Sequence, residues 1–169
     1  MNAEPIYLLD ANIFITAKNT YYAFDICPGF WGSLLDMYEK KSVFSIDRVR
    51  QELLMGRETE DLVQWVKTQV PAGFFFDIDS AVSDQYGKVM FWAQRHSQFS
   101  DAAKAKFASG ADGWLVAHAC VHGSIVVTNE QPAPMSKGAI KLPDVCQAFN
   151  VPFKSVFEVL RELNVKFVY

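Results

Sequence analysis

The stretch that decides the fold of this chain is Ile6-Tyr7-Leu8-Leu9-Asp10, a short apolar run that ends in an acid. Four apolar residues in a row, without polar alternation, are typical of a strand buried on both faces of a parallel sheet. Similar stretches recur as Val43-Phe44-Ser45-Ile46 and as Ser124-Ile125-Val126-Val127-Thr128. Helical patterns separate these stretches, so the sequence predicts an α/β protein with a central, mostly parallel sheet and helices on both faces.

The other elements are predicted from apolar periodicity and from capping residues. We expect Asp47 and Asp144 to cap the N-termini of two helices, because a carboxylate accepts hydrogen bonds from the first free amides. Residues 19–28 are predicted to be irregular. Helices are expected over residues 11–18, 30–40, 48–55, 58–69, 82–93, 101–108, 112–119, 144–149 and 155–163, and further strands over 74–76 and 165–169.

The composition limits the class of protein. The chain has 169 residues, of which 50% are hydrophobic and 14% aromatic, so it can bury the core of one domain over residues 1–169. Sixteen basic and nineteen acidic side chains give a net charge of −3, and any contact with nucleic acid must therefore be local. No apolar run approaches the ~20 residues that cross a membrane, and the N-terminus has no signal-peptide pattern. Together with three cysteines that lack a CxxC spacing, this predicts a cytoplasmic protein with reduced thiols.

Four acids fall where the segments of such a sheet would converge. Asp10 directly follows the first strand, and Glu130 lies two residues beyond Thr128, the end of the last long one. Glu52 lies in the helix after the second strand, and Asp112 opens the helix before the strand at residues 124–128. Because ligands bind at the carboxyl ends of parallel strands, these side chains are expected to meet there. Taken singly, each acid is more simply a solvated side chain or a residue at a helix end.

A cluster of four carboxylates requires compensation of its charge. Two carboxylates ~4 Å apart repel by roughly 4 kcal/mol at an effective dielectric constant of ~20. The cluster therefore holds a proton or binds a cation, and oxygen ligands select Mg²⁺ or Mn²⁺. Such an ion activates water and stabilises a leaving oxygen, so the expected chemistry is hydrolysis of a phosphoester.

Four short motifs contain these acids. They read, in order, Leu8-Leu9-Asp10-Ala11-Asn12, Arg48-Val49-Arg50-Gln51-Glu52, Ala111-Asp112-Gly113-Trp114 and Val126-Val127-Thr128-Asn129-Glu130. They resemble the motifs of the PIN-domain ribonucleases, a family that includes the VapC-like toxins. The family motifs are an apolar strand followed by Asp-x-Asn, a helix with one Glu, an Asp that starts a helix, and a strand followed by Thr-x-acid. The stretches Ser45-Ile46-Asp47-Arg48 and Leu142-Pro143-Asp144-Val145-Cys146 resemble a PIN subfamily catalogued as a domain of unknown function.

The resemblance implies a three-layer α/β/α fold with a mostly parallel sheet of four to five strands. It implies that one or two Mg²⁺ or Mn²⁺ ions are bound by the residues that also catalyse hydrolysis, namely Asp10, Glu52, Asp112 and Glu130. Asn12 and Thr128 would orient carboxylates or water through hydrogen bonds. Members of the family cleave RNA, and many are toxins that form homodimers and are silenced by an antitoxin protein.

Two residues depart from the family pattern. Glu130 stands where most members have Asp, and its longer side chain moves the carboxylate. Gly113 follows Asp112 and is expected to give the start of the helix more freedom. The predicted function is a Mg²⁺- or Mn²⁺-dependent endoribonuclease, and the main alternative is a catalytically silent module that binds RNA or protein. A haloacid-dehalogenase-type phosphatase is a weaker alternative, because it needs a second Asp where this chain has Asn12.

The candidate substrate-binding residues are Arg48, Lys137 and Lys141, which place positive charge near the expected site. The last two belong to a loop of residues 131–141. This loop is interpreted either as a mobile flap that contacts phosphate or as a solvated loop, and the sequence favours neither.

Two further groups of side chains are expected to be structural. Aromatic residues crowd the segment of residues 21–31, where they could stack on RNA bases, but packing of this segment onto the body is favoured. These residues are Tyr21, Tyr22, Phe24, Phe30 and Trp31. His118 and His122 lie four apart on a predicted helix, and we expect an exposed helix face rather than a pair of metal ligands.

Overall fold

The computed structural model describes residues 3–168, so residues 1, 2 and 169 of the predicted domain lie outside the described residues. Five strands form one sheet in the order β3-β2-β1-β4-β5, and all neighbouring strands are parallel. The strands are β1 (Tyr7–Leu9), β2 (Val43–Ile46), β3 (Phe75–Phe76), β4 (Ile125–Val127) and β5 (Phe153–Lys154). The predicted α/β class with a parallel sheet is confirmed.

The strand order places β1 at the centre of the sheet. From β1 the chain moves to β2 and β3 on one side, and it then crosses to β4 and β5 on the other. The direction of winding therefore reverses between β1 and β4, and an open parallel sheet has its ligand-binding crevice at such a point. Leu9 of β1 pairs with Val127 of β4, so the next residues, Asp10 and Thr128, emerge side by side at the carboxyl edge.

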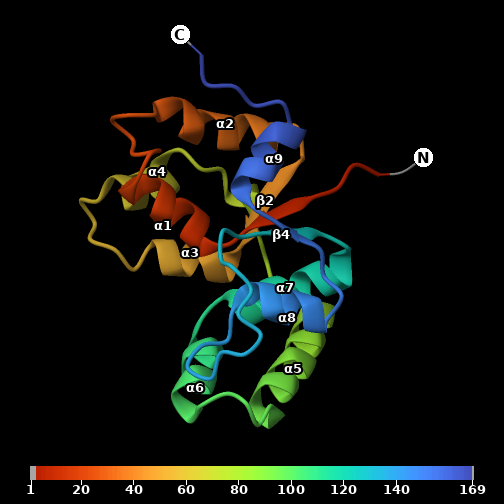
Figure 1. Ribbon diagram of the computed structural model, residues 1–169. Coiled ribbons are helices and arrows are strands. Elements are labelled where there is room, and N and C mark those ends of the chain that lie inside the picture. The colour runs from red at the N-terminus through yellow and green to blue at the C-terminus, as the bar shows by residue number, and fades with distance from the viewer. Residues whose placement is uncertain (1–2, 169) are drawn as a thin grey trace.

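Two layers of helices cover the sheet (Figure 1). Because connections between parallel strands are right-handed, the two directions of winding place their helices on opposite faces. One layer contains α1 (Ala11–Asn19), α2 (Pro28–Glu39), α3 (Asp47–Leu53), α4 (Asp61–Thr68) and α9 (Val156–Glu162). The other contains α5 (Ser80–Arg95), α6 (Asp101–Ser109), α7 (Asp112–His122) and α8 (Leu142–Ala148). None of the helices within residues 3–168 has the length and apolar character needed to cross a membrane.

The core surrounds the central strand. Tyr7, Leu8 and Leu9 of β1 are each at most 3% exposed, as the apolar run predicts for a strand covered on both faces. Phe14 of α1 and Phe74, the residue before β3, are fully buried in the same core. Burial of each side chain of this size contributes about 1.5–3 kcal/mol. Because β1 is buried within this core, it fixes the position of Asp10, the residue that follows it.

The prediction of a strand over residues 165–169 is wrong for residues 165–168, and Tyr169 lies outside the described part of the chain. The edge beside β4 is taken instead by β5, in which Phe153 pairs with Val126. The C-terminal segment lies against α2, where the ring of Phe167 packs edge-on against Phe30, 6.4 Å away between centroids. β5 has two residues, one of them Lys154, and lacks the apolar run that predicted a strand at residues 74–76, where the structure has β3.

The predicted N-caps at Asp47 and Asp144 are also wrong. Because β2 leads directly into α3, Asp47 is the first residue of that helix and Ile46 occupies the cap position. α8 begins two residues before Asp144, with a proline in its first turn, where the fixed φ of proline favours a helix. The Asp144 carboxylate instead accepts a hydrogen bond from the amide of Ala133, at 2.9 Å.

Candidate functional site

Asp10 caps α1 with one carboxylate oxygen and leaves the other free. Its Oδ1 accepts hydrogen bonds from the backbone amides of Asn12 and Ile13. Its Oδ2 is buried and has no hydrogen-bond partner in the described structure. Burial raises the pKa of Asp10 to about 6, against the lowering effects of the Thr128 hydroxyl and the Asn12 amide. A buried carboxylate oxygen without a donor is costly, so this position favours a proton or a cation.

Glu52 joins the end of α3 to the start of α7. Its Oε1 accepts a hydrogen bond from the amide of Ala111 at 2.7 Å, directly before Asp112 in the first turn of α7. This contact brings two acids that are 60 positions apart in sequence close together. The pKa of Asp112 is raised to about 8, chiefly by burial and further by the negative charges of Asp10, Glu130 and Glu52.

Glu130 joins the segment after β4 to α8. Its Oε2 accepts a hydrogen bond from the amide of Leu142 at 2.9 Å, and its own amide donates to the Thr128 hydroxyl at 3.1 Å. Thr128 is buried, so it fixes the backbone between the end of the strand and the acid. Asn12 is exposed at the start of α1 and reaches the same region.

These elements enclose a cavity of about 290 Å³ at the carboxyl edge of the sheet. Its wall contains three of the four predicted acids, Asn12 and two lysines. The lining residues are Asn12, Glu52, Ala103, Lys106, Phe107, Gly110, Asp112, Glu130, Ala139, Ile140 and Lys141. Asp10 is not in the wall, but it is close enough for its charge to raise the pKa of Asp112. The structure thus brings the four acids of the sequence prediction to one region.

The carboxylate oxygens of the four acids are suitable ligands for a hard divalent cation, but their present arrangement does not form a complete metal site. All four acids offer oxygen, and Oδ2 of Asp10 lacks a partner. Within residues 3–168, however, no group of three or more His, Cys, Asp or Glu side chains is positioned to hold a metal ion. In each glutamate, one carboxylate oxygen accepts a hydrogen bond from a backbone amide, and the other oxygen is left for a ligand. Binding of an ion by all four acids therefore requires their side chains to move closer together.

Of the three predicted substrate-binding residues, the structure places only Lys141 in the cavity wall. The guanidinium of Arg48 lies over the ring of Trp114, 4.9 Å from its centroid. Lys137 is exposed in the loop. Lys106 of α6 also lines the cavity, although the sequence does not predict it as a site residue. Nothing in the sequence distinguishes Lys106 from Lys104 of the same helix, because the position of each side chain depends on how α6 packs.

The loop of residues 131–141 is held to the neighbouring chain segment. The side-chain amide of Gln98, between α5 and α6, donates to the carbonyl oxygens of Pro134 at 2.7 Å and Ser136 at 2.6 Å. The amide of Ser100 donates to the carbonyl oxygen of Lys137 at 2.9 Å. These bonds favour a fixed wall over either a mobile flap or a freely solvated loop.

The aromatic segment packs onto the body of the protein, as predicted. Tyr22 stacks on Phe30 with ring centroids 4.5 Å apart, and Phe24 stacks on Trp31 at 3.9 Å. Trp31 in turn packs edge-on against Trp65 of α4, with centroids 4.9 Å apart. Tyr21 is the exception, with 85% of its surface exposed. Four of the five rings are therefore engaged in packing.

The prediction of an exposed helix face is wrong for His118. It is 4% exposed, because α7 is packed beneath α5 and against the sheet. Its ring stacks on Phe76 at 5.1 Å and lies 4.5 Å from the ring of His122. Burial, together with the neighbouring His122, lowers the pKa of His118 to about 4. His122 is exposed, with Nε2 3.1 Å from Oδ2 of Asp79.

Gly113 serves close packing rather than freedom at the start of α7. It lies within that helix and is buried. A Cβ atom at this position would stand 3.1 Å from Cε2 of Tyr86 and 3.4 Å from Cζ of Phe107. The absence of a side chain therefore lets α5 and α6 approach the first turn of α7, beside Asp112.

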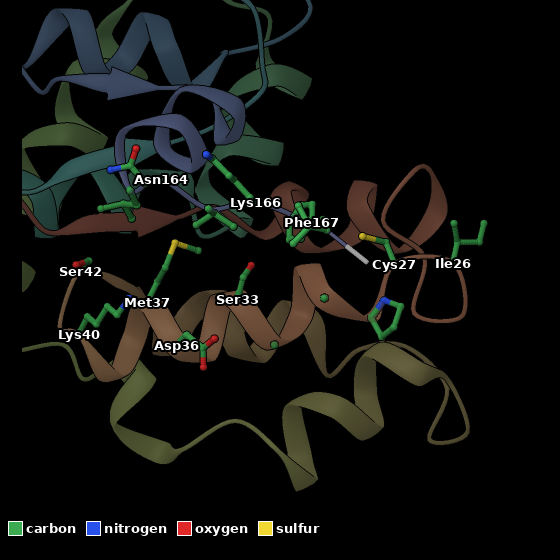
Figure 2. Close-up of a pocket in the computed structure, with 16 residues that line it drawn as sticks. Ile26, Cys27, Ser33, Asp36, Met37, Lys40, Ser42, Asn164, Lys166 and Phe167 are labelled. Atoms are coloured by element: carbon green, nitrogen blue, oxygen red, sulfur yellow. The ribbon is translucent and has the colours of Figure 1, made fainter.

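A larger cavity, of about 780 Å³, lies between α2 and the C-terminal segment, away from the four acids. Figure 2 shows Ser33 and Met37 rising from α2 toward the segment that carries Asn164, Lys166 and Phe167. None of the predicted site residues lines this cavity. Its size alone therefore gives no reason to place the chemistry there.

The sheet order and the two layers of helices define a three-layer α/β protein, with the four acids near the switch point of its sheet. The structure of FitAB bound to the IR36 DNA fragment is similar, with a TM-score of 0.55 and 19% identity over 89% of this chain and 94% of that chain. The crystal structure of FitAcB from Neisseria gonorrhoeae is similar too, with a TM-score of 0.54 and 20% identity over 88% and 96%. At these identities the likeness shows the fold alone, and it confirms the predicted PIN-like architecture.

Residues 7–167 match the model of the DUF4411 family, a domain of unknown function. The match covers nearly the whole sequence, so the chain belongs to this family. No curated protein matches the chain.

Proposed function

We propose that this protein is a metal-dependent endoribonuclease that hydrolyses phosphodiester bonds of RNA. The observation that carries the proposal is the convergence of acids from four separate segments on one region at the switch point of the sheet. Parallel α/β proteins bind ligands there, and clustered carboxylates require a cation or a proton. The resemblance of the four motifs to PIN-domain ribonucleases supports the same reaction.

The four acids, Asp10, Glu52, Asp112 and Glu130, would hold Mg²⁺ or Mn²⁺ in this proposal. When bound, such an ion supplies an activated water and stabilises the charge on a leaving oxygen. Asp10 is held rigidly by the amides of α1 and keeps one oxygen available. Thr128 fixes the backbone that carries Glu130, and Asn12 places a neutral donor and acceptor in the cavity wall.

The test is cleavage of a labelled RNA in Mn²⁺ by purified wild-type protein and by Asp10→Asn and Asp112→Asn. Asn has the size of Asp and can cap α1 as Asp10 does, so both variants are expected to fold. We expect each to lose about a hundredfold or more of the activity, since changes merely behind the metal ligands already cost 10–100-fold. Asp84→Asn, at an exposed position of α5, is the control and should cleave normally. Wild-type rates in either active-site variant would remove that residue from the mechanism.

A catalytically silent RNA-binding module is the second candidate function. The hydrogen bonds of Glu52 and Glu130 to backbone amides favour this function, because they give one oxygen of each glutamate a partner without a metal. This function predicts that RNA binds equally well with EDTA and with Mn²⁺ and remains intact in both.

We further propose that the protein acts as a toxin, silenced by an antitoxin protein and active as a homodimer. Support comes from the motif resemblance and from the fold shared with FitAB, which is described as bound to a DNA fragment. Expression of the wild-type chain alone should arrest bacterial growth, whereas expression of Asp112→Asn should not. Equal growth with both chains would count against the toxin role.

A further inference from the structure

Two lysines in the wall of the carboxylate cavity have no partner. Lys106 comes from α6, and Lys141 precedes α8. Across the described residues, neither ammonium group has an ion pair within 4.0 Å or a hydrogen bond. Lys104, on the same helix as Lys106, is different, because its Nζ donates to the carbonyl oxygen of Gln94 at 2.9 Å.

The two lysines share a cavity wall with three acids but form no ion pair with them in the described structure, and Lys106 is exposed to solvent. An ammonium group next to a carboxylate usually forms a charge-assisted hydrogen bond with it. In this cavity one oxygen of Glu52 accepts a hydrogen bond from the amide of Ala111, and one oxygen of Glu130 accepts a hydrogen bond from the amide of Leu142. The backbone thus supplies one donor to each glutamate, and the ammonium groups of both lysines remain available to an external anion.

The arrangement of charge matches a phosphodiester chain. Lysines act as point charges that bind phosphate oxygens without reading the base. The cavity volume, about 290 Å³, is at the lower limit for a small-molecule site, so it admits part of a single strand rather than a duplex. The overall charge of −3 repels polyanions, which makes this local pair of cations the more important for binding.

We propose that Lys106 and Lys141 bind backbone phosphates of single-stranded nucleic acid and hold the strand across the carboxylate cavity. The inference rests on the proposed function, since it assigns the two lysines to substrate binding at the same site. Both are positioning residues: they place a phosphodiester over the acids and take no part in proton transfer. Recognition through phosphate alone makes binding depend on length and salt rather than on sequence.

The test measures binding without cleavage. A fluorescein-labelled single-stranded RNA is titrated with the full chain in EDTA at several salt concentrations, and anisotropy gives the affinity. For single strands, the slope of log affinity against log salt changes by about 0.7 for each phosphate contact. We expect Lys106→Gln and Lys141→Gln each to make the slope shallower by about 0.7, and the double variant by about 1.4.

Two variants control for other effects of substitution. Lys106→Arg keeps the charge and should retain the wild-type slope. Lys88→Gln removes a lysine from an exposed position of α5, outside the cavity wall, and should leave the slope unchanged. Unfolding midpoints equal to that of the wild type would show that the variants are folded. A wild-type slope in the double variant, an equal loss in Lys88→Gln, or no binding by the wild type would overturn the proposal.

The outcomes for binding and for cleavage are separable. Lysine-dependent binding by a protein that does not cut RNA in Mn²⁺ would support the phosphate contacts and contradict the nuclease. Cleavage with a salt slope that is independent of both lysines would support the nuclease and contradict the phosphate contacts.

Discussion

At the scale of single residues, Asp112 shows the largest electrostatic effect in the site. Its pKa is raised to about 8, first by burial and then by Asp10, Glu130 and Glu52, while Lys106 lowers it. The unfolded chain releases this proton near the ordinary pKa of 3.8, so between these values the folded state binds the extra proton. Stability contributed by the protonated form is therefore lost as the pH rises toward 8.

This shift predicts that Asp112→Asn flattens the dependence of stability on pH. Between pH 6.5 and 8, in EDTA, the wild type should lose about 1–2 kcal/mol of its free energy of unfolding, and the variant distinctly less. The window lies above the raised pKa of Asp10, about 6, and above the range in which the neutral, buried His118 contributes. Urea unfolding at each pH measures the effect. An unchanged slope in the variant would assign the shift to another group.

Glu52 has a structural contact that can be separated from its charge. Its Oε1 accepts a hydrogen bond from the buried Ala111 amide, and Glu52→Gln keeps an oxygen that can accept it. Glu52→Ala leaves that amide without its partner, which should lower the free energy of unfolding by about 1–3 kcal/mol. Glu52→Gln should stay within about 0.5 kcal/mol of the wild type in urea unfolding, yet lose RNA cleavage. Equal destabilisation by both substitutions would show that the contact needs the charge.

At the scale of elements, the loop of residues 131–141 depends on Gln98. Its side-chain amide holds two carbonyl oxygens of the loop, at 2.6 and 2.7 Å. Gln98→Ala removes both hydrogen bonds and should therefore increase hydrogen exchange of the loop amides by about five- to tenfold, which corresponds to ~1–1.4 kcal/mol. Gln94→Ala, at an exposed position of α5, is the matched control. Equal exchange in all three proteins would mean that other interactions hold the loop.

Elements with apolar patterns were predictable from sequence, including the two-residue strand β3, whereas β5 was not. The run at residues 6–9 and its counterparts predicted the three long strands, because a strand buried on both faces is apolar throughout. β5 has two residues and no such pattern, and the apolar residues near the C-terminus predict a strand that the structure does not form over residues 165–168. Helix starts were displaced at Asp47 and Asp144, where direct entry from a strand and a nearby proline decide the boundary.

At the scale of the whole molecule, the site depends on strand order. Reversal of the winding between β1 and β4 brings Asp10 beside Thr128, and packing of α3, α7 and α8 adds the other acids. The sequence identified the acids, since each follows a strand or lies at or near a helix end. It could not identify Lys106, or the amides that hold Glu52 and Glu130, because these interactions exist only after distant elements have packed.

The proposed metal predicts a linked gain in global stability. An ion that binds only the folded state at a hundred times its Kd contributes about 2.7 kcal/mol. For a chain of this length we expect Mn²⁺ to raise Tm by roughly 5–10 °C, and EDTA to reverse the change. Asp10→Asn should abolish the rise and Asp84→Asn should keep it. Equal rises in both variants would indicate that Mn²⁺ binds elsewhere.

The most direct test of the central claim is the anomalous diffraction of Mn²⁺ in crystals of the wild-type protein. The account predicts an anomalous peak in contact with carboxylate oxygens of Asp10 and Asp112, with an oxygen of Glu52 and an oxygen of Glu130 directed toward it. Data from crystals with Mn²⁺ in excess that show no peak at this cavity would contradict it.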